Sequence, residues 1–259
     1  MPEADQVLMP RASLAAPRKN AVSVDPAQLE RAGLLLPTTT ARSLREEQFR
    51  HLKRQLLSHR RRSGAPAHGP LLIGVTSALP GEGKTSIAIN LALSLSREID
   101  TSVLLVDADV LRPDVLNRLG LPPAAGLLDL LVSPGMRLGD VVLTTDIPKL
   151  SILPAGRRAD NAGELIASNA MESLLSSLRS VCHDCAVVFD APPLLLSSEA
   201  RALAAMMDQV VIVVEAGKTP RDAVQQAFDA VADSPNVFAV LNKGSETRSY
   251  GYGYGDYYG

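Results

Sequence analysis

Residues 71–86 read LLIGVTSALPGEGKTS, and this stretch decides the fold. Its first part is apolar and predicts a buried strand, and a helix is expected over 84–97 after a glycine-rich turn. Gly83, Lys84 and Thr85 supply the GK[ST] end of a P-loop, in the strand–loop–helix setting that this motif requires. Glycines let successive backbone N–H groups surround phosphate oxygens, and a helix N-terminus adds partial positive charge. The stretch therefore predicts a phosphate-binding loop.

The loop motif gives particular residues a role. The expected nucleotide-binding residues are Pro80, Gly81, Glu82, Gly83, Lys84, Thr85 and Ser86. Lys84 is expected to reach the β- and γ-phosphates of a nucleotide, and the Thr85 hydroxyl to ligate Mg²⁺. Ala78 stands where the motif has glycine, and a small residue is tolerable there. The alternative is an ordinary glycine-rich turn that contains a lysine.

Strand and helix patterns alternate beyond the loop. Strands are expected at 71–76, 102–107, within 150–156, at 185–193 running into a loop, at 209–216 and at 236–242. Helices are expected at 84–97, 126–133, 164–181 (one or two), 198–207 and 220–232. This alternation predicts an α/β fold: a P-loop NTPase-type, mostly parallel sheet flanked by helices, with right-handed crossovers.

Three aspartates end predicted strands. Asp107 and Asp109 follow VLLV, and Asp190 follows VVF. Residues two apart on an extended chain face the same way, and ligands of parallel sheets bind beyond the carboxyl ends of the strands. An aspartate at a strand end can also cap the next turn, but three such residues beside a P-loop favour a metal and catalytic role. The set predicts phosphoryl transfer or nucleotide hydrolysis.

The composition separates two parts of the chain. The whole protein has 259 residues and a net charge of −2, which does not indicate a nucleic-acid binder. Residues 1–69 carry 12 Lys and Arg against 6 Asp and Glu, whereas residues 70–259 carry 14 against 22. No apolar run approaches membrane length and the N-terminus does not resemble a signal peptide, so a cytoplasmic protein is expected.

Cys182 and Cys185 are the two cysteines of the chain. Their CxxC spacing admits a metal or redox role, but there is no second pair of cysteines for a zinc site. Two cysteines in such a chain favour a reducing compartment over a disulfide framework. Ordinary, partly buried free thiols are therefore expected.

The basic N-terminal part contains one clear helix start. Residues 1–20 are rich in Pro and Ala without periodicity, which predicts disorder, and a short helical piece is expected within 25–35. Ser43 and Glu46 have capping-box spacing at the start of a basic helix over 43–58. Residues 61–69 are expected to be a linker.

The five tyrosines of the chain all lie in the C-terminal segment SYGYGYGDYYG. They are Tyr250, Tyr252, Tyr254, Tyr257 and Tyr258. A buried hairpin would pack poorly because glycine occupies every second position, and ordering such a segment costs entropy. A sticky aromatic tail is a second possibility. Flexible, exposed phenols that an enzyme modifies are the sharper hypothesis.

Several motifs resemble those of the bacterial tyrosine kinases, the P-loop kinases of polysaccharide export. ALPGEGKTS, LLVDADVLRP and VVFDAPP occur in the order and spacing of that family, and GLLDLL, LPAG, NAGELIAS and the tyrosine cluster are also similar. VDPAQLERAGLL followed by REEQFRHLKRQLL resembles the tyrosine autokinases of exosortase-type exopolysaccharide systems. The resemblance covers roughly residues 20–259.

The resemblance implies a role for each site residue. Asp107 would accept the tyrosine hydroxyl proton and act with Lys84 in catalysis. Asp109 and Asp190 would assist Thr85 in holding Mg²⁺, and Asn242 is placed to bind the adenine of ATP. The five tail tyrosines would be autophosphorylated.

The resemblance also implies the organisation and partners of the chain. Residues 1–41 would be largely disordered, 42–69 a basic self-association helix and linker, 70–242 the kinase domain, and 243–259 the tail. Glu47, Arg50 and Lys53 match the family's EX2RX2R self-association stretch, with Lys in place of the final Arg. A homo-oligomeric ring, a membrane-anchored polysaccharide co-polymerase as activator, peripheral membrane association through that partner, and an opposing tyrosine phosphatase are expected. No nucleic-acid partner is expected.

Two other functions remain open at this point. A partitioning or septum-positioning ATPase of the same P-loop branch would carry a signature lysine where this chain has Leu79. A non-catalytic subunit that only binds nucleotide would not need the three aspartates. A basic helix can also pair its charges internally, for example Glu46 with Arg50, or contact anionic lipid.

Overall fold

A parallel-type sheet forms the centre of the molecule. The computed structural model describes residues 20–36, 43–62, 69–182 and 184–244. Within these residues the sheet has eight strands in the order β1-β4-β5-β3-β6-β2-β7-β8. The strands are β1 (Ala21–Val22), β2 (Leu71–Ser77), β3 (Ser102–Asp107), β4 (Leu143–Thr145), β5 (Leu150–Leu153), β6 (Cys185–Asp190), β7 (Gln209–Glu215) and β8 (Val237–Asn242).

The strands run parallel with one exception. Among the described strands, β4 and β5 form the antiparallel pair, and the other neighbours pair in parallel. β2 and β6 are buried along their whole length, as expected for central strands with both faces covered. The predicted class, a mostly parallel P-loop sheet flanked by helices, is confirmed.

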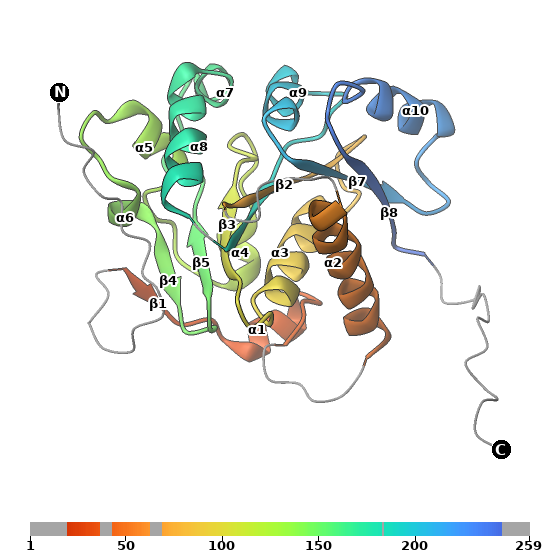
Figure 1. Cartoon of the computed structure of the whole chain (residues 1–259), viewed down its shortest axis with the longest axis horizontal. Helices are drawn as coiled ribbons and strands as arrows, with labels where there is room; N and C mark the ends of the chain where they lie inside the picture. Colours follow the sequence, from red (N-terminus) through yellow and green to blue (C-terminus); the bar gives the residue numbers. More distant parts are fainter. Residues whose placement is uncertain (1–19, 37–42, 63–68, 183, 245–259) are drawn as a thin grey trace.

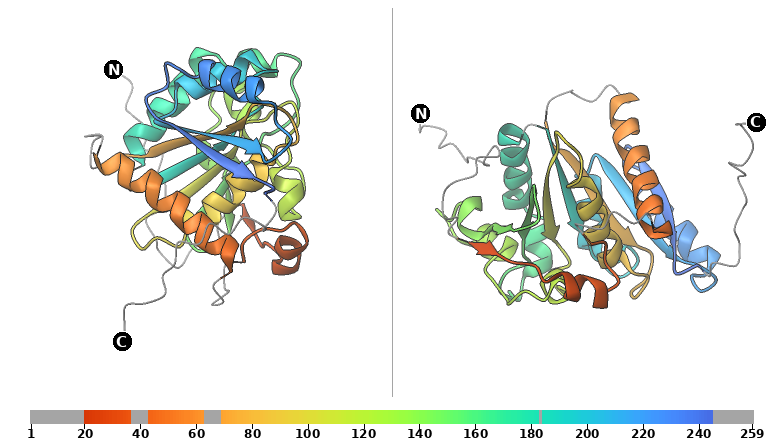
Figure 2. Two further views of the ribbon diagram at one scale, coloured as in Figure 1. Left: turned by 90° about the vertical axis from the view of Figure 1, so that its right-hand side faces the viewer. Right: turned by 90° about the horizontal axis from the view of Figure 1, so that it is seen from below.

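Helices cover both faces of the sheet (Figures 1 and 2). They are α1 (Pro26–Arg31), α2 (Leu44–Arg62), α3 (Lys84–Leu95), α4 (Val115–Leu119), α5 (Leu127–Val132), α6 (Leu138–Val141), α7 (Ala162–Ile166), α8 (Asn169–Val181), α9 (Ser198–Ala205) and α10 (Arg221–Asp229). In Figure 1, α7 to α10 lie above the sheet and α1 to α4 lie below or in front of it.

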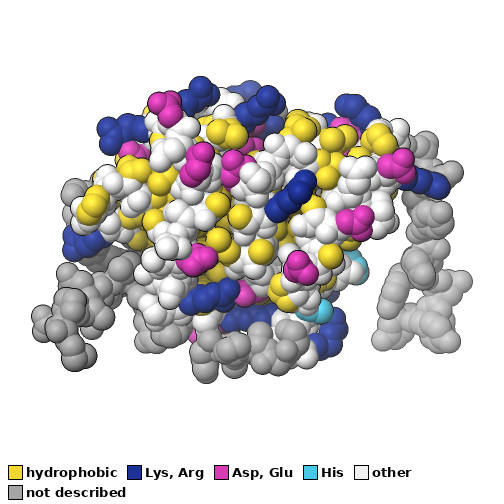
Figure 3. Space-filling model, turned by 90° about the horizontal axis from the view of Figure 1, so that it is seen from above, with side chains coloured by type: hydrophobic (Ala, Val, Ile, Leu, Met, Phe, Trp, Pro, Cys, Tyr) yellow, Lys and Arg dark blue, Asp and Glu magenta, His cyan; other side chains and the backbone are white. Residues whose placement is uncertain are grey.

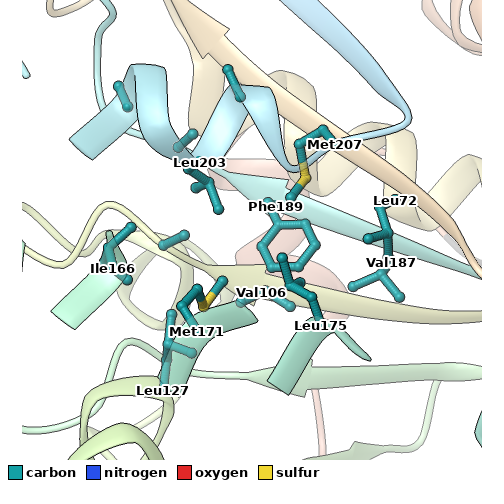
Figure 4. Packing of buried hydrophobic residues seen from close by; sticks show 14 of the residues in the cluster. Leu72, Val106, Leu127, Ile166, Met171, Leu175, Val187, Phe189, Leu203 and Met207 are labelled. Carbon is teal, nitrogen blue, oxygen red and sulfur yellow. The ribbon is translucent and has the colours of Figure 1, made fainter. Parts of the chain in front are cut away.

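The sheet divides the core into two apolar clusters. Because side chains alternate along a strand, Val106 and Phe189 face the α7–α9 side, whereas Leu105 and Val188 face the α2–α3 side. Figure 4 shows Phe189 at the centre of the first cluster, near Val106 and Met207. The outer surface of the layer formed by α7 to α10 carries a mixture of apolar, basic and acidic side chains (Figure 3).

The N-terminal segment is more ordered than the largely disordered 1–41 that was expected, and the short helix expected within 25–35 is present. Residues 20–36 form β1, which pairs with β4, and α1, which begins after an Asp25 cap. Leu29 is fully buried, and the Leu35 N–H donates to the side chain of Asn90 on α3 (2.7 Å). The segment therefore belongs to the packed domain, because its leucines complete the core below the sheet.

The basic helix begins where its capping box predicted. The Glu46 N–H donates to Ser43 Oγ (3.1 Å), and the Ser43 N–H donates to the Glu46 carboxylate (3.3 Å). The helix runs to Arg62 rather than Ser58, so the first part of the predicted linker is helical. Charges do pair within the helix, but Arg50 binds Glu47, and Glu46, which was given as the example partner, binds Arg97.

The prediction of two free cysteine thiols is wrong. Cys182 follows α8 and Cys185 begins β6, and the structure joins them in a disulfide. Both residues are buried. The short connection between helix and strand brings the two side chains together, which the spacing alone did not establish.

Two further points concern the whole chain. None of the helices in the described part is long and apolar enough for a membrane span. The predictions for residues 1–19 and for the five tail tyrosines lie outside the described residues.

Candidate active site

The P-loop connects β2 to α3, and its backbone has the left-handed conformation that its glycines predicted. Gly81 and Gly83 have φ values of 84° and 96°, a left-handed region that favours glycine. Gly83 precedes the first residue of α3, so the helix N-terminus opens onto the loop. Lys84 and Thr85 follow and are buried. This arrangement is the anion-binding geometry that the motif predicts.

The three predicted acids meet at the carboxyl ends of neighbouring strands. Asp107 and Asp190 are register partners on β3 and β6. Lys84 Nζ lies 2.6 Å from Asp109 Oδ2 and 3.6 Å from Asp190 Oδ1. The structure thus brings together Lys84 and all three aspartates, as the sequence predicted.

Burial and the neighbouring charges shift the pKa values of these groups. Burial raises the pKa of Asp107 to about 8, repulsion from Asp190 adds to the rise, and the Val115 N–H opposes it. Burial also raises the pKa of Asp190 to about 6, while the Lys84 ammonium opposes the rise. Burial lowers the pKa of Lys84, but Asp190 and Asp109 outweigh it, so the net shift is upward. The protonation states of Lys84, Asp107 and Asp190 therefore depend on one another.

The acids suit a magnesium ion that is also held by phosphates. Within the described ranges, Asp107 Oδ1 and both Asp190 carboxylate oxygens are buried without a hydrogen-bond partner. No group of three His, Cys, Asp or Glu side chains in the described part of the chain is arranged to hold a metal by itself. Mg²⁺ commonly binds through one or two carboxylates, waters and substrate phosphates, so the donor set fits such an ion.

The P-loop is held from outside by β7 and β8. The buried Glu82 carboxylate accepts the Leu79 N–H (2.7 Å) and the Thr219 hydroxyl. Asn242 Nδ2 donates to the Glu82 carbonyl (2.8 Å), and Lys243 Nζ donates to the Gly81 carbonyl (2.7 Å). These bonds engage loop carbonyls from the side of β8. Adenine binding by Asn242 remains a prediction, because the amide contacts the loop here.

A pocket lies beside Asp107. Its volume is about 250 Å³, and its lining consists of Asp107, Pro113, Leu116, Asn117, Leu121, Pro123, Ala124, Pro154, Ala155 and Gly156. Of these residues, Asp107 alone is charged. One wall comes from α4 and the residues around it, and the other from the end of β5. Sequence reasoning did not find this pocket, because its walls are distant in the chain.

Asp129 fixes the second wall and was missed by the sequence analysis. Its buried carboxylate accepts the Gly126 N–H (3.0 Å), the Arg157 N–H (3.0 Å) and Arg157 Nε (2.6 Å). Burial favours a higher pKa of Asp129, but these hydrogen bonds outweigh it and lower the pKa. A Cβ on Gly156 would lie 2.5 Å from Asp129 Oδ2. The sequence analysis identified GLLDLL and LPAG only by their resemblance to family segments. The contacts of Asp129 give a physical reason for the two segments, because they hold them together.

Arg118 ties the first wall to the P-loop helix. Its Nη1 donates to Ser86 Oγ (3.0 Å), and its Nε donates to Asp114 (2.6 Å). The Val115 N–H at the start of α4 donates to Asp107 Oδ2 (3.1 Å). The helix that lines the pocket is therefore bonded both to the phosphate loop and to the candidate base.

The predicted self-association residues lie on different faces of α2. Glu47 and Arg50 form an ion pair (2.7 Å) near the surface. Lys53 is buried and binds Glu98 (2.6 Å) and the Ser94 carbonyl (3.0 Å) of the same chain. Lys53 thus holds α2 against the α3 region, and its role in self-association stays a prediction together with that of the other two.

The strand, loop and helix with aspartates at neighbouring strand ends define the class of P-loop nucleotide-binding proteins. A family model described as an AAA domain matches residues 72–234. Tyrosine-protein kinase YwqD of Bacillus subtilis (strain 168) is 30% identical over 222 residues, which cover 84% of this chain and 90% of YwqD. The chain belongs to the bacterial tyrosine-protein kinase family.

Two further proteins extend this comparison. ExoP of Rhizobium meliloti (strain 1021), named a succinoglycan biosynthesis transport protein, is 32% identical over 177 residues, which cover 66% of this chain and 22% of ExoP. The crystal structure of the VpsO kinase domain superimposes with a TM-score of 0.62 at 30% identity and covers 76% of this chain and 96% of that chain. The predicted family is confirmed, and relatives of this chain act in exopolysaccharide biosynthesis.

Proposed function

We propose that this protein is an ATP-dependent protein-tyrosine kinase that phosphorylates its own C-terminal tyrosines in trans. In this proposal it regulates exopolysaccharide or capsule synthesis and export. The observation that carries the proposal is the pocket beside Asp107. Its apolar lining suits an aromatic ring, and its one charged lining residue is the candidate base.

The pocket and the P-loop divide the reaction between them. A phenol ring against Leu116 and Pro154 would direct its hydroxyl to Asp107. The phenol oxygen attacks the γ-phosphorus of ATP, the bond to the ADP oxygen breaks, and the phenol proton passes to the Asp107 carboxylate. Lys84 and the loop N–H groups stabilise the charge that moves onto the phosphates.

Magnesium would be held by Thr85, Asp109 and Asp190, and when bound it neutralises phosphate charge and orients the γ-phosphate. Lys84 now pairs with the same two acids (2.6 and 3.6 Å). We infer that nucleotide and metal binding replace this internal ion pair, which frees Lys84 for the phosphates.

The proposal of transfer between subunits rests on the family resemblance, because the reach of the tail permits transfer within one chain as well. β8 is four strands from β3 in the sheet order, or roughly 19 Å at the usual strand spacing. A tail that follows β8 is long enough to reach Asp107 in the same chain, so geometry alone does not exclude transfer in cis. Self-association through α2, a membrane-anchored co-polymerase as activator and an opposing tyrosine phosphatase complete the proposal.

A mixing experiment tests both the activity and its direction. One chain carries Lys84→Met with an intact tail, and the other has all five tyrosines replaced by Phe but an intact site. Each alone should remain unmodified with MgATP, and the mixture should acquire phosphotyrosine on the Lys84→Met chain.

Three outcomes are distinct. Phosphate on the Lys84→Met chain only in the mixture supports transfer in trans. Modification of wild type without any in the mixture would mean transfer in cis. No phosphotyrosine in wild type or mixture would overturn the kinase proposal.

A further inference from the structure

Each wall of the Asp107 pocket adjoins an exposed arginine in the chain. Pro113 and Gly156 belong to opposite walls of the pocket. Arg112 immediately precedes Pro113, and Arg157 immediately follows Gly156. Both arginines are exposed. A peptide whose tyrosine enters the pocket would therefore come close to two cationic side chains.

Arg157 is held ready to bind an anion. Its backbone N–H and its Nε both donate to the buried Asp129 carboxylate, which fixes the plane of the guanidinium. The side chain is nevertheless 82% exposed. The terminal nitrogens can thus still donate to a carboxylate from solvent, in a forked geometry that guanidinium groups provide.

The Arg112 guanidinium has no competing partner near the pocket. Its backbone N–H donates to Asp109 Oδ1 (3.2 Å), but in the part of the chain that the structure describes the Arg112 guanidinium forms no ion pair or hydrogen bond. The nearby Asp114 is already paired with Arg118 (2.6 Å), and Asp109 with Lys84. The acids closest in sequence are therefore occupied by other cations and do not pair with the Arg112 guanidinium.

The tail offers these arginines one distinctive target. Tyr252 and Tyr254 are flanked by glycine on both sides, whereas Tyr257 directly follows Asp256. Building on the proposed kinase function, we propose that Arg112 and Arg157 select an acceptor tyrosine preceded by an acidic residue. Tyr257 is then the preferred first acceptor of the cluster.

The expected preference is modest because the contact is exposed. Surface ion pairs are weak and are screened by salt. Two such contacts, one of them with a fixed guanidinium, give about a 3- to 30-fold preference in kcat/KM for an acidic neighbour at low salt.

The test uses whole chains and maps the phosphates. The enzyme is the chain with all five tyrosines replaced by Phe, and the acceptor is the Lys84→Met chain with or without Asp256→Asn. Asp256→Asn should slow phosphorylation of Tyr257 by about 3- to 30-fold and leave Tyr252 unchanged. Arg112→Glu in the enzyme should remove the preference and favour an Asp256→Lys acceptor.

The control is Arg158→Glu, an exposed arginine one residue farther from the pocket lining. This change should leave the preference in place. Equal rates at Tyr257 with Asp256 and with Asn, or equal effects of Arg158→Glu and Arg112→Glu, would overturn the selection but leave the kinase function intact. Failure of the Asp256-containing acceptor to gain any phosphotyrosine would instead count against transfer in trans, and against the kinase function itself if wild type also gains none.

Discussion

Asp129 is buried, and its carboxylate joins the residue before α5 to the loop after β5. Its three hydrogen bonds come from two backbone N–H groups and one guanidinium. Because no other described residue bonds these donors, removing the charge leaves them poorly satisfied. Asp129 therefore maintains one wall of the Asp107 pocket and bonds none of Lys84, Asp107, Asp109 or Asp190.

We predict that Asp129→Asn lowers the free energy of unfolding at pH 7 by about 1–3 kcal/mol, since an amide N–H₂ would face N–H donors. The folded-state pKa of Asp129 is lower than its ordinary value of 3.8. Its stabilisation is thus present above that value and is lost as pH falls through the folded pKa.

The difference between wild type and Asp129→Asn should therefore shrink below about pH 4. Urea unfolding of both chains from pH 7 downward measures it, with Asp160→Asn at an exposed position as the control. A difference that stays constant over this range would contradict the assigned role.

The residues that bear chemistry were predictable because they occur in local motifs. Lys84, Thr85 and the aspartates each follow a strand whose apolar pattern is visible in the sequence. Glu82 was predicted as a nucleotide ligand, but its side chain turns toward Leu79 and Thr219. Asp129 and Arg118 act through partners far away in the chain, so no local pattern could reveal them.

At the scale of elements, β8 packs directly against the P-loop at Gly83. A Cβ on Gly83 would lie 2.2 Å from Asn242 Nδ2, whereas a Cβ on Gly81 would meet nothing within 4 Å. Both glycines have positive φ, so alanine at either carries a similar backbone cost of about 1–2 kcal/mol. The two substitutions therefore differ in the clash with β8.

We predict that Gly83→Ala weakens MgATP binding at least about 10-fold more than Gly81→Ala, which corresponds to about 1.4 kcal/mol. Adding Asn242→Ala to Gly83→Ala should restore part of the affinity, because it removes the atom in conflict. Isothermal titration calorimetry measures all three. Equal losses for the two glycines would show that β8 does not set the loop conformation.

A second prediction at this scale concerns how tightly the N-terminal segment, residues 20–36, packs on the domain. Leu29 of α1 is fully buried, whereas Leu44 at the start of α2 is 62% exposed. Leu29→Ala should lower the free energy of unfolding by about 2–5 kcal/mol, and Leu44→Ala should change it by no more than about 0.5 kcal/mol. Urea denaturation compares them, and a loss below about 1 kcal/mol for Leu29→Ala would mean that the segment packs only loosely.

The long elements were predictable, and so were the short α1, α5 and β5, but the two shortest strands were not. The strands at 102–107 and 209–216 stood out as continuous apolar runs, as buried parallel strands do. β1 and β4 have two and three residues, too few for any periodicity to appear. Residues 20–36 gave only the short helical pattern within 25–35, because their few leucines are buried only by contact with the rest of the fold.

At the scale of the whole molecule, the proposed self-association through α2 depends on how the charges of this helix pair within the chain. The Glu47–Arg50 pair is exposed and spaced i,i+3, and such pairs contribute only about 0.3–0.5 kcal/mol. A neighbouring subunit can therefore replace it at little cost. Lys53 is less available, since it holds Glu98 and Ser94 in its own chain.

We predict that Glu47→Ala combined with Arg50→Ala reduces the mass measured by light scattering and slows tail phosphorylation. Gln48→Ala, an exposed uncharged position on the same helix, is the matched control. Unchanged assembly together with weaker binding to anionic liposomes would instead favour a lipid-binding role for this helix.

The central claim is that this site transfers phosphate to the tail tyrosines with Asp107 as the base. The most direct measurement is intact mass with phosphosite mapping after incubation with MgATP, on wild type, Lys84→Met and Asp107→Asn. Wild type should gain several increments of ~80 Da, all mapping to residues 250–258, and both variants should gain none, while Asp107→Asn still binds nucleotide. Phosphate mainly on Ser or Thr, or near-normal modification of Asp107→Asn, would contradict the account.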